Sequence, residues 1–458
     1  MLEETQYGYQ FKSGTKINHL FYMDDIKLYA NKEKDIDSLI HLSQVHSKNI
    51  GMTFSIEKCA RLILKKDHSM LTDGLRMPNG TIKYIEEGYK NLGILHSNIN
   101  HEVEVRHKAI TEYKSRLGQV LQSQLNAKNQ VMAINTYALP VIRYSAGIIK
   151  WTEEAINETN IATRKLLTMH GALHPKSDTT RLYFDRKDGG RGLKSLQQRV
   201  KEEEQGIKAH AASMATSGKC LGEFQSAALT MDLRHDDEKN DWRTKPVHGA
   251  YRRQISKVGD LHQTYMWLKN GNLTTNTDSL IIAAQEQVLP TRQLQTKVYH
   301  TRDDPRFRLC RDAPQTIQHI ISGCKQLAGN DYPEWHNHVA RVLYRSLCNE
   351  YGLNKPQHSF EGPVEVNEND LAKILWDFYS RIHKHVLANQ PDIVVVDKEN
   401  KRPILIDIEV PNDYNIASKK RQVRERSPSL RRDLKMLGCK NNCSHSRHWG
   451  TERNNTGA

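Results

Sequence analysis

Two adjacent aspartates, Asp24 and Asp25, stand between two short stretches in which apolar side chains alternate along the chain. Residues 19–22 and 26–30 have the period-two spacing of β-strands, with the acidic pair where a turn would join them. Carboxylates at such a tip repel each other unless a cation lies between them. Mg²⁺ binds proteins through one or two carboxylates together with substrate phosphates. The pattern therefore predicts a hairpin that holds catalytic Mg²⁺ or Mn²⁺. A surface hairpin with an acidic turn is the alternative.

Two later segments extend this pattern. Residues 22–25 read Tyr-Met-Asp-Asp, which resembles the active-site hairpin of reverse transcriptases. Residues 51–59 resemble the family's segment whose lysine lies near the incoming nucleotide, and residues 89–94 resemble its primer-grip turn. All three occur in the family's order. The resemblance implies that Asp24 and Asp25 bind the catalytic metal ions. It also implies nucleotide or primer contacts for Tyr22, Met23, Lys58, Leu92 and Gly93.

One part of the reverse transcriptase pattern does not fit. Reverse transcriptases use three carboxylates, and the first lies on a strand that precedes the hairpin. Only some twenty residues precede Asp24, too few for that strand and for a fingers region. The resemblance therefore implies that the chain corresponds to the C-terminal part of a longer polyprotein, and that it does not polymerise by itself.

Composition limits the compartment and the partners. A net charge of +14 in 458 residues favours a polyanionic partner, here an RNA template and a DNA target, although solubility alone is an alternative reason for it. Seven cysteines in a chain of this length do not make a disulfide framework, which favours an intracellular site in the nucleus or cytoplasm. No run approaches the ~18 apolar residues that span a bilayer, so we expect no membrane partner.

The middle of the chain has helical periodicity. We expect a helix after the hairpin, with an acidic start at residues 35–38. Apolar residues then recur at helical spacing between residues 110 and 121, and a second helix should run from Ala127 to about Ala138, where Pro140 ends or kinks it. Basic faces on these helices fit a thumb that follows a primer–template duplex, and ordinary solvated faces are the alternative.

Further along, the chain predicts a turn and a helical linker. The glycines of residues 188–193 suit a turn, and no Lys-Ser/Thr follows them as a phosphate loop would require. Residues 232–243 are a charge-rich candidate linker, and residues 279–288 form a short amphipathic helix that Pro290 terminates.

Cys310, His319 and Cys324 have the spacing Cys-x8-His-x4-Cys. Tetrahedral zinc takes four such ligands. A complete Cys-x2-Cys-x8-His-x4-Cys knuckle would need cysteine at position 307, where this chain has phenylalanine. The region otherwise resembles the knuckle of non-LTR retrotransposons that carry a restriction-like endonuclease. Cys348 or water is the candidate fourth ligand, and a short helix with a buried histidine and inert thiols is the alternative.

A second acidic cluster follows in two β-type runs, residues 391–397 and 402–410. A turn at Glu399-Asn400 would place Asp392 opposite Asp407, and alternation would put Glu409 on the same face. Three carboxylates on one face form a plausible Mg²⁺ site. The runs resemble the Pro-Asp…Asp-x-Lys nuclease motif with glutamate at the lysine position. In the retrotransposon version the lysine lies on the next helix, where Lys419 or Lys420 could serve. A polar-edged hairpin of an unrelated domain is the alternative.

The expected fold class is α+β with several domains. They are a partial reverse transcriptase palm (1–100), a helical thumb (101–200), a mostly helical linker (201–300), a degenerate zinc knuckle (301–350), a restriction-endonuclease-like domain (365–440) and a disordered tail (441–458). The chain resembles a C-terminal fragment of a non-LTR retrotransposon polyprotein, whose nuclease nicks the target before the polymerase copies RNA. A non-catalytic nucleic-acid-binding remnant and a decayed copy without function are the alternatives.

The tail contains Cys439, Cys443, His445 and His448, a tempting zinc spacing. The last ligands are too close together, and the residues between them offer no apolar support. Another reading frame of one possible coding sequence gives an apolar strand instead. We therefore interpret the tail as the product of a one-base shift near Asn442, which would leave the nuclease domain destabilised.

Overall fold

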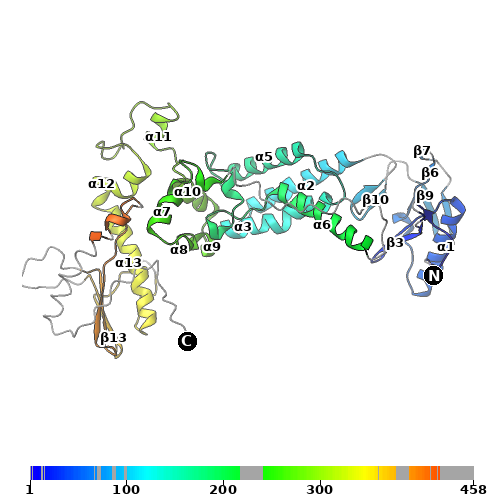
Figure 1. Ribbon diagram of the computed structural model, residues 1–458. Helices are drawn as coiled ribbons and strands as arrows, with labels where there is room; N and C mark the ends of the chain where they lie inside the picture. The colour runs from blue at the N-terminus through cyan, green and yellow to red at the C-terminus, as the bar shows by residue number, and fades with distance from the viewer. Residues whose placement is uncertain are drawn as a thin grey trace, which may run out of the picture. The chain divides into compact units, whose positions relative to one another are not determined.

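The computed structural model describes most of the chain. The described residues are 2, 4–11, 14, 16–65, 68–69, 74–84, 89–96, 101–216, 241–358, 361–377, 391–412, 414–419 and 421–422. Helices and small sheets occur together, so the expected mixture of α and β structure is confirmed (Figure 1). The chain divides into two compact units, residues 1–124, 129–170 and 193–236 in one and residues 125–128, 171–192 and 237–458 in the other. The predicted tail structure at 441–458 lies outside the described residues.

The acidic pair lies in a hairpin, as predicted. Strand β3 (His19–Tyr22) pairs antiparallel with β4 (Asp25–Leu28), and Tyr22 faces Asp25 across the ladder. Met23 and Asp24 form the two-residue turn, in which Met23 has a left-handed φ of 56°. The expected helix follows as α1 (Glu33–Asn49), with Glu33 and Asp35 in its first turn, where carboxylates favour the helix dipole.

Short elements make up the rest of the first hundred residues. They are β1 (Tyr9–Gln10), β2 (Lys16–Ile17), η1 (Ile56–Lys58), β5 (Ala60–Arg61), β6 (Leu64–Lys65), β7 (His68–Ser69), β8 (Leu75–Met77), β9 (Gly80–Tyr84), β10 (Tyr89–Asn91) and β11 (Ile94–His96). The hairpin β3–β4 is a separate two-stranded sheet, and β10–β11 forms another. Among the described residues, no strand joins either edge of β3–β4.

The predicted helical region, residues 101–200, is mainly helical up to Met169 and again from Leu196, whereas residues 170–195 form turns and two short 3-10 helices. It comprises α2 (Glu102–Gln122), α3 (Ala127–Ala133), the π-helical turn η2 (Ile134–Ala138), α4 (Leu139–Ala146), α5 (Glu153–Met169) and α6 (Leu196–Thr216). The helical structure does not end at Pro140, which was one of the two predicted outcomes. The π-helical turn η2 precedes the proline, and α4 begins at Leu139. A proline in the first turn of a helix loses no internal hydrogen bond, so α4 continues to Ala146.

Residues 171–192 and 241–297 form short helices around a buried network of ion pairs. The elements are η3 (Thr180–Leu182), η4 (Arg186–Asp188), η7 (Trp242–Thr244), α7 (Ala250–Val258), α8 (Leu261–Thr264), α9 (Met266–Asn270), α10 (Thr275–Gln285) and α11 (Arg292–Lys297). Gly189 and Gly192 have positive φ, which confirms the predicted turn. The helix expected at 279–288 begins earlier, at Thr275, because the Thr274 side chain caps it by accepting from the Thr277 N–H.

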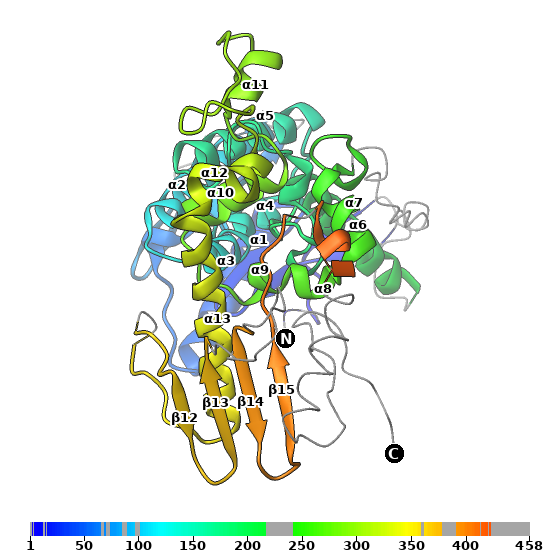
Figure 2. The same cartoon turned by 90° about the vertical axis from the view of Figure 1, so that its left-hand side faces the viewer.

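The remaining elements are η8 (His319–Gly323), α12 (Lys325–Ala328), α13 (Asp331–Glu350), β12 (Val366–Glu368), β13 (Ala372–Trp376), β14 (Ile393–Asp397) and β15 (Arg402–Ile406). The four strands form an antiparallel meander in chain order, with α13 lying along the sheet (Figure 2). Tyr344 and Cys348 of α13 pack on Ile374, Ile393 and Val395, all fully buried.

The pairing of β14 with β15 matches the predicted register. Ile393 faces Ile406 and Asp397 faces Arg402, so the next pair outward is Asp392 and Asp407. The strands are joined by a turn of four residues, 398–401, rather than by a two-residue turn. The turn is centred on the predicted residues, which leaves the register unchanged.

A candidate metal centre

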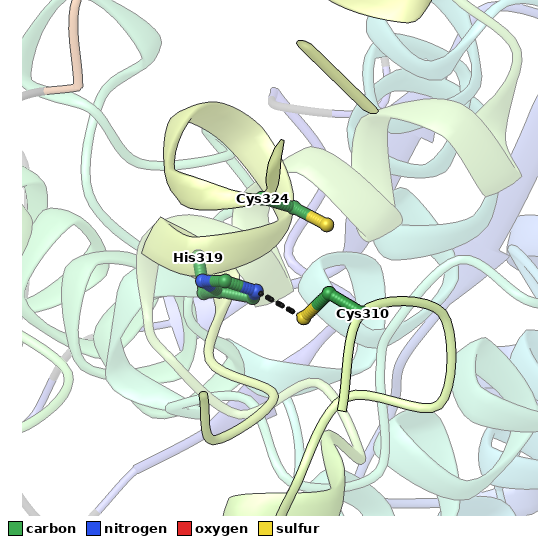
Figure 3. Close-up of side chains that lie close together, drawn as sticks. All are labelled: Cys310, His319 and Cys324. Atoms are coloured by element: carbon green, nitrogen blue, oxygen red, sulfur yellow. Dashed lines mark hydrogen bonds between the residues drawn. The ribbon is translucent and has the colours of Figure 1, made fainter. Parts of the chain in front are cut away.

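Cys310, His319 and Cys324 form the one group of three potential metal ligands found among the described residues. Their sulfur and nitrogen ligand atoms all lie within 4.8 Å of one another. Cys310 Sγ is 3.2 Å from His319 Nε2, and the Cys324 sulfur points toward the same space (Figure 3). Cys324 is buried, whereas the other two are half-buried. Thiolate and imidazole are the donors that zinc takes, so the group can bind a metal such as zinc.

A closed loop and a helix start hold the three ligands. The loop is closed by a bridge between Arg306 and Pro314 and by the Phe307 N–H, which donates to the Ala313 carbonyl at 2.9 Å. Arg311, next to the first ligand, has a left-handed φ of 55°. His319 opens η8, and its N–H donates to Thr316 Oγ1.

Local hydrogen bonds lower the pKa of the first ligand. The Asp312 N–H and, to a smaller extent, the Ala313 N–H donate to the Cys310 sulfur and lower its pKa, against the opposing effect of burial. The thiolate is the form of cysteine that binds metal ions. Such donors stabilise negative charge on sulfur whether or not a metal is bound.

The position of the missing fourth ligand holds an aromatic ring. Phe307 is 5% exposed, and its ring lies edge to face against His319 with 5.7 Å between centroids. The expectation that Cys348 could be the fourth ligand is wrong, because this residue lies in the core beneath α13 and is outside the ligand group. The residues therefore fit a metal with three protein ligands. They do not fit a structural zinc site, which takes four.

Tyr332 supports the centre from α13, and no sequence pattern pointed to this residue. Its hydroxyl accepts from the Cys324 N–H at 3.0 Å and donates toward the carbonyls of His319 and Ile320 at 3.2 and 3.0 Å. The two carbonyls belong to the first two residues of the π-helical turn η8, and the N–H belongs to the residue that follows this turn. One hydroxyl thus fixes the backbone of two of the three ligands.

The hairpin of β3 and β4 presents its tip to solvent. Met23 is 86% exposed and Tyr22 57% exposed, with Asp24 and Asp25 also exposed. Among the described residues no third acid or histidine joins the two aspartates as a ligand group. Mg²⁺ binding at this tip stays a prediction.

The predicted nucleotide segment, residues 51–59, and the predicted primer-grip turn, residues 89–94, lie next to each other. The Tyr89 hydroxyl donates to the Lys58 carbonyl at 2.7 Å, which joins η1 to β10. Leu92 and Gly93 form the turn between β10 and β11, both with left-handed φ, and the Tyr144 hydroxyl of α4 donates to the Leu92 carbonyl. Their contacts with a nucleotide or primer stay predictions.

The second acidic cluster is only partly assembled. The Asp392 carboxylate accepts from the Ile408 N–H at 2.6 Å and lies 3.3 Å from His336 Nε2. Strand β15 ends at Ile406, so strand alternation no longer fixes the side of Asp407 and Glu409. Lys419 contacts Glu409 with 3.1 Å between nitrogen and oxygen. These acids form no three-ligand group among the described residues, and His336 is a partner that the sequence analysis missed.

No protein-family model matches the chain, and no curated protein matches it. In the part of the chain that the structure describes, no helix is both long and apolar enough to cross a membrane.

Proposed function

We propose that the chain is part of a non-LTR retrotransposon protein that combines an RNA-directed DNA polymerase with a DNA endonuclease. The observation that carries the proposal is the Tyr22–Asp25 hairpin, in which the two-residue turn places Asp24 at an exposed tip beside Asp25. An isolated hairpin is only marginally stable, and exposed aspartates at its tip add repulsion. A metal-binding role accounts for this arrangement better than a structural one.

The order of the segments supports the same proposal. The Lys58 segment and the turn at Leu92 and Gly93 follow the hairpin and lie next to each other through the bond from Tyr89. The Cys-His-Cys group follows them, and the hairpin with Asp392 opposite Asp407 comes last. We assign Asp24 and Asp25 to the polymerase metal ions, and Lys58 to the nucleotide. Lys419, which contacts Glu409, is our choice for the nuclease lysine.

The second candidate is a nucleic-acid-binding remnant without catalysis. It is favoured by the state of Asp392, whose carboxylate is engaged by the Ile408 N–H and by His336 instead of facing a gathered set of acids. A net charge of +14 serves this candidate equally well, since phosphate contacts need only Lys and Arg.

The test uses the purified 458-residue chain and a labelled RNA–DNA hybrid. We expect salt-dependent binding in fluorescence anisotropy, with the logarithm of the affinity falling linearly against the logarithm of salt concentration. We expect a nick in duplex DNA with Mg²⁺ or Mn²⁺, which distinguishes the nuclease from the remnant. Binding without nicking would favour the remnant, and no binding at low salt would exclude both.

Polymerase activity is a separate arm of the same experiment. We expect no template-directed nucleotide incorporation by this chain, because two-metal catalysis needs ligands beyond the Asp24–Asp25 pair. Each ~1.4 kcal/mol by which the activation barrier rises slows the reaction tenfold. Incorporation that is lost in Asp24→Asn would show instead that the chain is a complete polymerase.

A further inference from the structure

The Cys-His-Cys group brings two soft thiolate donors and one imidazole together, and an aromatic residue takes the fourth position of the knuckle spacing. We propose that Cys310, His319 and Cys324 bind Cu(I) in a three-coordinate site, in preference to Zn²⁺. The inference rests on the geometry of this group and holds whether or not the proposed function is correct.

The number of donors is the first argument. Three ligand atoms lie within 4.8 Å of one another, so one ion can contact all of them after small side-chain adjustments. Zn²⁺ in structural sites is almost always four-coordinate and tetrahedral. Cu(I) is a soft ion for which thiolates are preferred ligands, and three donors suffice for it. The donor set therefore suits Cu(I) as it stands, whereas Zn²⁺ would need a water as its fourth ligand, as in catalytic sites.

The surroundings of the group provide the second argument, because among the described residues no fourth cysteine, histidine or carboxylate joins the three ligands. Phe307 is buried, and its ring lies edge to face against the imidazole of His319, so the residue at the fourth position of the knuckle spacing offers no donor atom. The hydroxyls of Tyr332 and Thr316 already bond backbone groups of Cys324, His319 and Ile320. Zn²⁺ would have to recruit a ligand from solvent at the half-buried side of the group.

Phe307 is thus the residue that determines the metal. A cysteine at position 307 would complete the four-ligand spacing. The backbone there already forms a tight turn toward Cys310, in which the Phe307 carbonyl accepts the Arg311 N–H. Leucine at the same position would keep an apolar side chain and add no donor. These two substitutions separate the effect of ligand number from the effect of removing the ring.

The experiment uses the full chain with Cys439→Ser and Cys443→Ser, which removes the other closely spaced thiols. Under anaerobic conditions it is titrated with Cu(I) against a chromophoric Cu(I) chelator, and with Zn²⁺ against a zinc indicator. X-ray absorption at the copper edge then gives the ligands. We expect one Cu(I) held by two sulfurs and one nitrogen, lost in Cys324→Ser and retained in Cys59→Ser, a thiol outside the group.

The Phe307 variants complete the test. Phe307→Cys should raise zinc affinity by more than the roughly 10–100-fold that outer-shell partners contribute to metal sites. Phe307→Leu should keep Cu(I) binding and gain no zinc affinity, and circular dichroism verifies that each variant is folded. Zinc binding by the parent chain as tight as that of Phe307→Cys would overturn the proposal. So would a Cu(I) stoichiometry that Cys324→Ser leaves unchanged.

Discussion

His336 Nε2 lies 3.3 Å from Oδ2 of Asp392 and 2.8 Å from the carbonyl oxygen of Ile408. The Ile408 N–H donates to the same carboxylate oxygen at 2.6 Å. Asp392 immediately precedes β14 and Ile408 follows β15, so one side chain of α13 closes the end of the hairpin opposite its turn. The helix is held to the sheet by this polar end as well as by the apolar contacts of Tyr344 and Cys348.

The stabilising effect of His336 should depend on pH. Burial lowers the pKa of His336, but the hydrogen bond with Asn337 and the charge of Asp392 outweigh it, so the pKa is raised above its ordinary value. A group whose pKa is raised in the folded state contributes its full stabilisation below its unfolded pKa, which is about 6.5 for histidine. That stabilisation is lost as pH rises through the folded-state pKa. His336→Gln should therefore cost on the order of 1 kcal/mol at about pH 5.5 and less at about pH 8.5.

Amide hydrogen exchange of residues 393–397 measures this effect in the sheet itself. His338→Gln, an exposed histidine on the same helix, is the matched control and should leave the exchange unchanged at both pH values. An equal effect at both pH values would mean that the histidine acts only through its packing, and an effect that grows with rising pH would mean that its pKa is lowered in the folded state.

A second prediction concerns the buried ion pairs. Asp278 is 1% exposed and contacts Arg186 at 3.0 Å and Arg191 at 2.9 Å. Asp278→Ala would leave two guanidinium groups without their carboxylate in a buried site, and removing one partner of a buried ion pair typically costs about 3–5 kcal/mol. We expect a large fall in the urea midpoint of this unit. Asp304→Ala, which removes an exposed ion pair and a hydrogen bond from the Arg306 N–H, should lower the midpoint much less.

Sequence patterns predicted the local structure of this chain better than they predicted its long-range contacts. Alternation around Asp24 and Asp25 gave the hairpin, and the turn at 399–400 gave the register of β14 with β15, because both depend on neighbours in sequence. His336 and Tyr332 could not be found in this way, since each acts on backbone or side chains brought near only by the packing of α13. The end of β15 at Ile406 was missed for the same reason.

The register also distinguishes two aspartates in the nuclease proposal. Asp397 accepts from the Asn400 N–H and from Asn400 Nδ2, both at 2.8 Å, so it caps the turn. Asp407 directly follows β15, at the end of the hairpin opposite this turn, where Asp392 directly precedes β14. If a Mg²⁺- or Mn²⁺-dependent nick is observed, Asp407→Ala should abolish it, whereas Asp397→Ala should lower stability by about 1 kcal/mol per lost hydrogen bond and keep the nick. The reverse result would place the metal at the turn.

The turn that sets this register offers a prediction about stability. Lys401 is exposed and has a φ of 49°, a left-handed conformation that costs an L-residue roughly 1 kcal/mol and glycine almost nothing. Lys401→Gly should stabilise the hairpin by about 0.5 kcal/mol after the entropy cost of glycine is subtracted, and slow the exchange of β14 amides about twofold. Glu399→Gly, in the same turn but without a positive φ, should pay only the entropy and speed the exchange. Faster exchange in Lys401→Gly would mean that the lysine side chain, rather than its backbone conformation, decides the stability of this turn and hence the pairing of Asp392 with Asp407.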